Sequence, residues 1–248
     1  MSNKRYEVLD SIRGIVLISM IFYHGVWDMV YIFHVRWDWY RSDLVRLWQQ
    51  SICWSFILLS GFCWSLGKRQ LRRGLIVLGA GTLVSLVTCI FMPDNAVIFG
   101  VLTFLGSAMI LTVPLDKYLS KWKPLWGTVL ALALFVLTRN INNRFLGFGH
   151  WNVIKLPDSW YANLATTFLG FRMRGFYSTD YFSMMPWFFL FLTGYFVHKL
   201  AVEKEWMPYL SVFRLRPVAW LGRHSLLIYL LHQPVIYGFL YVYFRMVC

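Results

Sequence analysis

An apolar stretch near the start of the sequence, MIFYHGVWDMVYIFH at residues 20–34, contains three titratable side chains. His24 and Asp28 stand four residues apart, a spacing at which side chains meet on one face of an α-helix. A carboxylate beside an imidazole fixes the tautomer of the ring and raises its basicity, which is how a general base is oriented. The stretch therefore indicates acid–base chemistry, and His24, Asp28 and His34 are the candidate catalytic residues.

The same helix face carries further polar side chains. At 100° per residue, an arc of about 60° holds Asp10, Arg13, Leu17, His24, Asp28 and Tyr31. A purely structural role, in which polar pairs bond helices together, is worth about 0.6 kcal/mol per hydrogen bond. Placing an aspartate at the centre of a membrane costs about 2.5–3.5 kcal/mol, so a functional role is favoured. Asp10, Arg13 and Tyr31 are candidate substrate-binding residues, as is His232 in the stretch GRHSLLIYLLHQP.

The composition shows which elements must position these side chains. Of the 248 residues, 58% are hydrophobic and only 14% are charged, whereas soluble domains carry about a quarter charged residues. Apolar runs long enough to cross a membrane predict seven spans, at residues 13–33, 45–66, 74–91, 97–114, 124–138, 182–199 and 218–243. The sequence therefore predicts an all-α, polytopic transmembrane helix bundle that forms a single domain over residues 1–248.

One connection between spans is long, from Arg139 to about Tyr181. Its segment WYANLATTFLGF, residues 160–171, is apolar but too short to span, so we expect a re-entrant or interfacial piece. Long structured loops tend to carry function. The loop is therefore expected to form an ordered cover over the outer face.

The net charge of +13 is explained by topology rather than by nucleic-acid binding, because the basic residues fall between apolar runs. The segments on one side would be Lys4–Arg5, Lys68–Arg73, Asp116–Lys123 and Lys199–Arg216. By the positive-inside rule that side is the cytoplasm, which holds the N-terminus. The cysteines Cys53, Cys63, Cys89 and Cys248 show no CxxC and no zinc spacing, so no metal is expected.

Two spans contain similar segments, SFILLSGF at residues 55–62 and FFLFLTGY at residues 188–195. Each combines an apolar run, a small hydroxyl residue, a glycine and an aromatic residue. Small residues let helix backbones approach closely in membranes, and we expect these segments to mark close helix packing.

Several motifs together resemble the transmembrane acyltransferase superfamily: DSIRG at the start, SFILLSGF, YSTDYFSMMPW and the closing GRHSLLIYLLHQP. The likeness is to the small bacterial DUF1624 membrane proteins grouped with the catalytic domain of heparan-α-glucosaminide N-acetyltransferase. The resemblance implies an enzyme of the bacterial inner membrane that takes an acyl group, with acetyl expected, from cytoplasmic acyl-CoA. It would deliver the group to a hydroxyl or amine of an extracytoplasmic glycan or sugar. In YSTDYFSMMPW, Asp180 and Trp187 are the candidate substrate-binding residues.

The resemblance leaves two candidates for the base. The catalytic histidine of the heparan enzyme lies in an aromatic-His-x-x-Trp context, which FHVRW at residues 33–37 matches, so His34 is one candidate. The family's asparagine, about eleven residues earlier, aligns with Tyr23 or His24. His24 ranks slightly ahead because Asp28 is its carboxylate partner. Asp38 could orient His34 only if the helix continues past residue 33.

The CoA donor would need a cationic site for its phosphates. The candidates are in the KRQLRR loop: Lys68, Arg69, Arg72 and Arg73. The positive-inside rule alone explains the basic residues of this loop about as well as CoA binding does. The expected partners are the lipid bilayer and a sugar acceptor, and a homodimer is one candidate assembly. The main alternative function is a proton-coupled transporter with His24, Asp28 and His232 as a relay, and a non-catalytic assembly partner in envelope synthesis is a third.

Overall fold

The structure is a computed structural model that describes residues 6–211 and 215–247. The Lys4–Arg5 segment and Cys248 lie outside the described residues. The chain divides into two compact units, one formed by the described residues up to Phe56 and from Glu205, the other by Ile57–Lys204. Each unit is described by itself.

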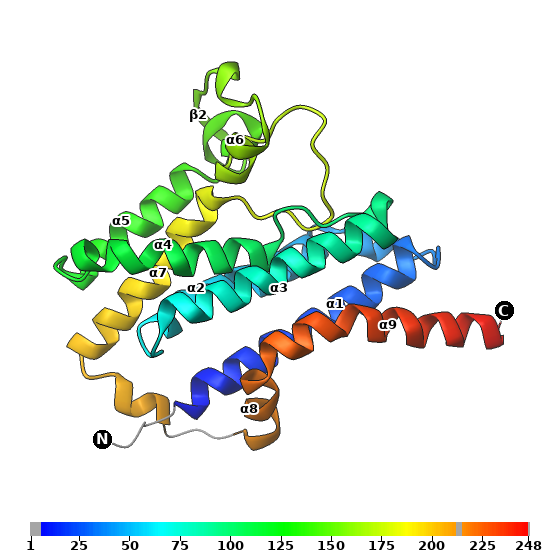
Figure 1. The fold of residues 1–248 in the computed structure, drawn as a ribbon, viewed down its shortest axis with the longest axis horizontal. Coiled ribbons are helices and arrows are strands. Elements are labelled where there is room, and N and C mark those ends of the chain that lie inside the picture. Colours follow the sequence, from blue (N-terminus) through cyan, green and yellow to red (C-terminus); the bar gives the residue numbers. More distant parts are fainter. Residues whose placement is uncertain (1–5, 212–214, 248) are drawn as a thin grey trace. The chain divides into compact units, whose positions relative to one another are not determined.

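The first unit is built around α1 (Glu7–Tyr31), which packs against α8 (Arg216–Arg223) and α9 (Ser225–Val247) (Figure 1). It also contains two 3-10 helices, η1 (Asp38–Arg41) and η5 (Met207–Ser211), and the start of α2 (Asp43–Trp64). Leu17, Met20 and Ile52 form its buried apolar cluster. The predicted last span, 218–243, is wrong in its extent, because the backbone leaves the helix at His224 and separates α8 from α9.

The second unit holds two packed helix pairs, α3 with α4 and α5 with α7, together with the end of α2 (Figure 1). Its helices are α3 (Gln70–Phe91), α4 (Val101–Leu119), α5 (Pro124–Leu137), α6 (Leu164–Leu169) and α7 (Met184–Glu203). Short 3-10 helices lie between them, at η2 (Pro93–Asn95), η3 (Ile141–Asn143) and η4 (Asp158–Trp160).

The predicted class, a polytopic transmembrane helix bundle, is confirmed. Among the described residues, six helices are long and apolar enough to cross a membrane, by length and composition: α1, α3, α4, α5, α7 and α9. The predicted number was seven. The helix α2 has the length of a span but is not one of the six, and its adjacent Gln49 and Gln50 lower its hydropathy.

The two similar segments in α2 and α7 pack against each other. A Cβ added to Gly61 would lie 1.9 Å from the backbone oxygen of Phe191, and one added to Gly194 would lie 2.1 Å from that of Leu58. Only glycine allows two backbones to approach so closely. The expectation of close helix packing at these segments is confirmed.

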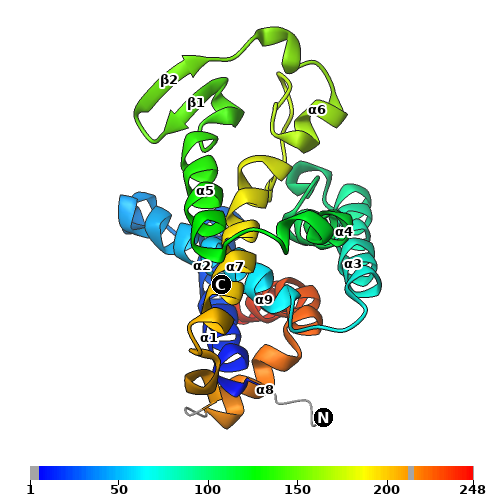
Figure 2. The same ribbon diagram turned by 90° about the vertical axis from the view of Figure 1, so that its left-hand side faces the viewer.

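The loop between α5 and α7 is ordered, and it contains a hairpin that the sequence analysis did not predict. Strands β1 (Phe145–Phe148) and β2 (Trp151–Lys155) pair in antiparallel fashion beyond the end of α5 (Figure 2). The predicted interfacial segment 160–171 is η4 followed by the six-residue α6, which begins at a capping box of Asn163 and Thr166.

A second close crossing joins α1 to α8. A Cβ on Gly222 would lie 1.9 Å from the backbone oxygen of Asp10, and one on Gly14 would lie 2.1 Å from that of Val218. The guanidinium of Arg13 binds Asp10 at 3.0 Å and the Gly222 carbonyl at 3.3 Å. The crossing therefore depends on Gly14 and Gly222, and the hydrogen bond from Arg13 to the Gly222 carbonyl joins the two helices.

Gly222→Ala is expected to destabilise the first unit by about 1–3 kcal/mol, because the new methyl group must push α8 away from α1. Thermal unfolding of the protein in detergent measures the loss. Gly238→Ala in α9 is the matched control, since a Cβ at Gly238 would meet no atom of the described part of the chain within 4 Å. Equal midpoints for the two variants would contradict the packing argument.

Candidate active site

Four polar side chains from α1 and α9 form one buried cluster. His24 and Asp28 lie one helical turn apart on α1, and His232 and Gln233 are neighbours on α9. Asp28 is fully buried and His232 is 9% exposed. The packing of α1 against α9 brings together polar residues from opposite ends of the sequence.

Two contacts between the helices hold the cluster. The Gln233 Nε2 group donates a hydrogen bond of 2.6 Å to Asp28 Oδ1. The rings of His24 and His232 meet edge to face, with centroids 4.9 Å apart. The carboxylate of Asp28 is thus bonded across the helix interface to Gln233, where the sequence analysis paired it with His24 on its own helix.

The hydrogen bond of His232 determines which ring nitrogen is free. Its Nδ1 lies 2.5 Å from the backbone oxygen of Tyr229. A carbonyl oxygen can only accept, so Nδ1 must carry the hydrogen and donate it. In the neutral ring, Nε2 then holds a lone pair, as a general base requires.

The cluster contains more hydrogen-bond acceptors than donors. Three of its buried atoms have no partner among the described residues: Asp28 Oδ2, His232 Nε2 and Gln233 Oε1. Unpaired buried polar groups are costly and call for an explanation. All three atoms can accept, so the complementary ligand is one that donates, such as a hydroxyl or an amine.

His34 and Tyr31 lie near the end of α1, outside this cluster. The helix ends at Tyr31, and the exposed His34 follows with a positive φ of 56°. The helix does not continue past Phe33, so the condition under which Asp38 would orient His34 is not met. Tyr31 is 51% exposed and packs on Tyr40, a buried residue of η1 whose phenol pKa is raised by burial.

The other candidates of α1, Asp10 and Arg13, form an ion pair with each other on that helix, and Arg13 also binds the Gly222 carbonyl of α8. Their geometry accounts for a structural contact, and substrate binding by them stays a prediction.

The basic loop lies in the second unit. Lys68, Arg69 and Arg72 are exposed, and Arg69 has a φ of 59° immediately before α3. The guanidinium of Arg73 lies over Gly67, where an added Cβ would be 1.5 Å from its Nη1. Three exposed cations at one helix start can attract phosphate, and CoA binding here stays a prediction.

Asp180 and Trp187 also belong to the second unit. Asp180 Oδ2 accepts a hydrogen bond of 3.0 Å from the Val101 backbone N–H and so caps the start of α4. Trp187 is 5% exposed, and the Arg139 guanidinium lies over its ring at 4.8 Å. Both residues stabilise the junction between the loop and the helices.

Comparison with known families identifies the chain. The family model of the catalytic region of heparan-alpha-glucosaminide N-acetyltransferase matches residues 5–234. The chain belongs to this family. Comparison with curated proteins and with solved structures finds no match.

Membership of the heparan-α-glucosaminide N-acetyltransferase family confirms the family inferred from the sequence motifs and makes the chain a multi-pass membrane protein of an acetyltransferase family. The family match gives no support to a proton-coupled transporter. The matched region ends at Pro234 and includes both histidines of the cluster as well as Gln233.

Two polar residues in this acetyltransferase-family chain were missed by the sequence analysis. Gln233 stands beside His232 in an apolar run, and that placement was its only signal. His198 on α7 is 8% exposed, packs edge-on against Phe62 and has an Nδ1 without a partner among the described residues. The sequence signal for His198 was its position within the apolar stretch that forms α7.

Asp180 provides a pH test of the loop. Burial raises the pKa of its carboxyl to about 6 from 3.8, although the hydrogen bond from Val101 opposes the shift. The folded state therefore holds the proton of Asp180 more tightly than the unfolded state does. The contribution of the protonated carboxyl to the free energy of unfolding is lost as pH rises from 3.8 through about 6.

Asp180→Asn cannot ionise but keeps an oxygen for the Val101 N–H. As pH rises from 3.8 to about 6, we expect the thermal midpoint of Asp180→Asn to increase relative to that of the parent protein. Above about pH 6 the difference between the two midpoints should stay constant. The exposed Asp94→Asn variant is the control. Parallel midpoint curves for parent and Asp180→Asn would show that the carboxyl is not buried in this way.

Proposed function

We propose that the protein transfers an acyl group, with acetyl expected, from acyl-CoA to a hydroxyl or amine of a sugar. The observation that carries the proposal is the cluster of His24, Asp28, His232 and Gln233, in which three buried acceptor atoms find no donor among the described residues. A sugar hydroxyl or amine supplies such donors. Membership of the acetyltransferase family supports the same reaction class.

In the proposed reaction, the acceptor donates a hydrogen bond to His232 Nε2, and Asp28 Oδ2 and Gln233 Oε1 hold its other polar hydrogens. Nε2 takes the proton as the acceptor oxygen or nitrogen attacks the thioester carbonyl carbon. The carbon–sulfur bond breaks, and the protonated His232 returns the proton to the CoA thiolate. The products are the acylated sugar and free CoA, and the ring of His24 packs against that of His232 and holds it in place.

The donor would approach from the cytoplasm, where Lys68, Arg69, Arg72 and Arg73 supply positive charge for the CoA phosphates. The acceptor would be an extracytoplasmic glycan or sugar, and the membrane the bacterial inner membrane. This direction of transfer requires a cytoplasmic N-terminus.

Labelling of single cysteines tests this orientation. In a variant whose native cysteines are replaced by serine, Lys68→Cys is expected to resist a membrane-impermeant thiol reagent in intact cells. Tyr177→Cys, 65% exposed in the loop before α7, is expected to react. The opposite pattern would reverse the topology and with it the direction of transfer.

A reconstituted assay tests the reaction itself. The purified protein in proteoliposomes is supplied with radiolabelled acetyl-CoA and with amino sugars or neutral sugars. Label is expected in the sugar, with an equal amount of free CoA thiol. Absence of CoA release with every acyl-CoA and sugar tested would overturn the proposal.

A further inference from the structure

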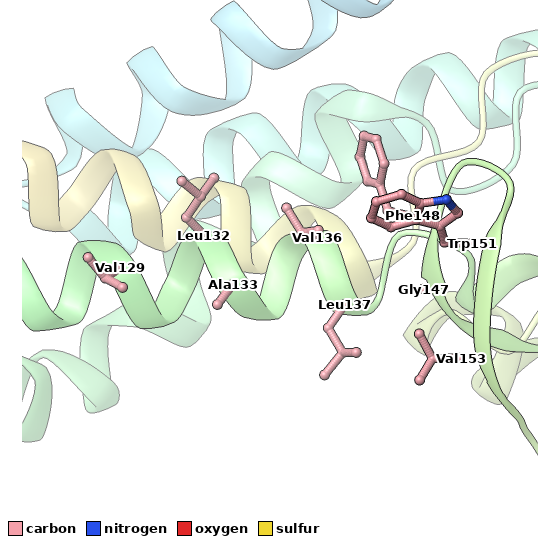
Figure 3. A pocket seen from close by; sticks show the side chains of 9 residues that line it. All are labelled: Val129, Leu132, Ala133, Val136, Leu137, Gly147, Phe148, Trp151 and Val153. Atoms are coloured by element: carbon pink, nitrogen blue, oxygen red, sulfur yellow. The ribbon is translucent and has the colours of Figure 1, made fainter.

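An apolar groove lies between α5 and the β1–β2 hairpin. The residues that line it are far in the sequence from those of the polar cluster. Figure 3 shows Phe148 and Trp151 of the hairpin near Val136 and Leu137 of α5. The groove has a volume of about 520 Å³. Its lining contains no charged side chain: Val129, Leu132, Ala133, Val136, Leu137, Gly147, Phe148, Trp151 and Val153.

The hairpin is held in place by one buried side chain. Asn140, 6% exposed, donates from its Nδ2 to the Gly149 oxygen at 3.0 Å and to Asn152 Oδ1 at 2.9 Å. Its backbone N–H binds the Gly147 oxygen at 3.0 Å. The turn is therefore tied to the end of α5, and the groove is a built feature of the second unit.

The groove lies along a candidate membrane span. The stretch Pro124–Asn143, which includes α5, is one of the candidate membrane spans. Leu132 and Val136 are 46% and 41% exposed in the groove, and Trp151 is 80% exposed at its rim. Tryptophan is enriched at the membrane interface, where its ring lies at the level of the lipid head groups. We therefore expect the groove to open to lipid, close to one membrane surface.

The connection that contains the hairpin is basic. The exposed Lys155 ends β2 and pairs with Phe145, and neither residue lines the groove. The whole connection between α5 and α7 carries five lysines and arginines against two aspartates. A net positive charge on the connection that forms one wall of an apolar groove complements a lipid with a negatively charged head group.

We propose that this groove binds one hydrocarbon chain of an anionic phospholipid, with Lys155 at the phosphate. The lipid fills the space between the hairpin and α5 and fixes the loop on the membrane surface. This binding site is independent of the proposed acyl transfer, because it involves none of the residues of the polar cluster.

Photo-crosslinking tests the site in the full-length protein. The protein is placed in nanodiscs that contain phosphatidylglycerol or phosphatidylcholine with a photoreactive group on the acyl chain, and adducts are mapped by mass spectrometry. Adducts are expected to concentrate in residues 129–137 and 148–153, with more from phosphatidylglycerol. Lys155→Gln should reduce that preference about fivefold, the effect of one lysine near an anionic surface.

A matched pair of variants separates the groove from general lipid contact. Ala133→Trp fills the groove and is expected to abolish its adducts. Leu125→Trp places the same ring on the exposed side of α5 but outside the groove, and should leave the adducts unchanged. Adducts spread evenly over the exposed helices, unchanged adducts in Ala133→Trp, or crosslinks to a second copy of the chain would each overturn the proposal. The readout needs no activity, so its failure would not touch the proposed reaction.

Discussion

His232→Ala is expected to lower the rate of acyl transfer by about 10²–10⁴, the usual contribution of general acid–base catalysis. The variant removes the Nε2 lone pair that the Nδ1 bond to Tyr229 keeps available. Acyl-CoA binding should be retained, because no cationic residue is altered. Single-turnover transfer from labelled acetyl-CoA, with donor binding measured separately, gives both quantities.

The other histidines provide the controls. His24→Ala is expected to lose activity too, since its ring contacts that of His232. His224→Ala, at an exposed position before α9, should leave transfer near normal. If His34→Ala alone abolishes transfer while His24→Ala and His232→Ala stay active, the reaction takes place at the end of α1 and the buried cluster is structural.

Asp28→Asn is expected to reduce transfer by about 10²-fold or more while the yield of folded protein stays close to normal. The amide oxygen can still accept from Gln233, but the atom in place of Oδ2 becomes a donor and can no longer stabilise positive charge on a neighbouring imidazole. Folded yield is measured by gel filtration of the detergent-solubilised protein.

Asp28→Ala separates the two roles of this carboxylate. It removes the partner of the buried Gln233 amide, so we expect a lower folded yield as well as lost activity. Normal turnover of Asp28→Asn would show that the carboxylate only bonds helices together, the structural interpretation of the polar stripe.

The helices could be predicted where an apolar run ends at a local signal. The span expected at 124–138 is α5, Pro124–Leu137, because proline favours the first turn of a helix and polar residues follow its end. The break at His224 could not be predicted in the same way. It depends on α8 lying against α1 at Gly222, a contact between distant parts of the chain.

The β1–β2 hairpin could not be predicted from the sequence for a different reason. Its turn has a local signal, Gly149 with a φ of 57° between the aromatic residues Phe148 and Trp151. The strands are short and only partly apolar, however, and a segment of that length does not distinguish strand from interfacial helix. The conformation is determined by Asn140, whose hydrogen bonds to the turn can be seen only in the structure.

The candidate site was partly predictable for a similar reason. Helical periodicity placed His24 and Asp28 on one face of α1, but it carries no information about the helix that this face meets. The bond between Asp28 and Gln233, and the contact of His24 with His232, follow from the register of α1 against α9. His34 could not be judged from periodicity, because it lies beyond the last turn of α1.

The hydrogen bond between Asp28 and Gln233 also has a consequence for the synthesis of the protein. The two residues are 205 positions apart in the sequence. At about 5–20 residues per second, roughly 10–40 s pass between translation of one codon and of the other. During that time α1 is in the membrane with a carboxylate whose partner helix does not yet exist. The site therefore cannot assemble until Gln233 has been translated, and translation that terminates before Gln233 yields a membrane protein without it.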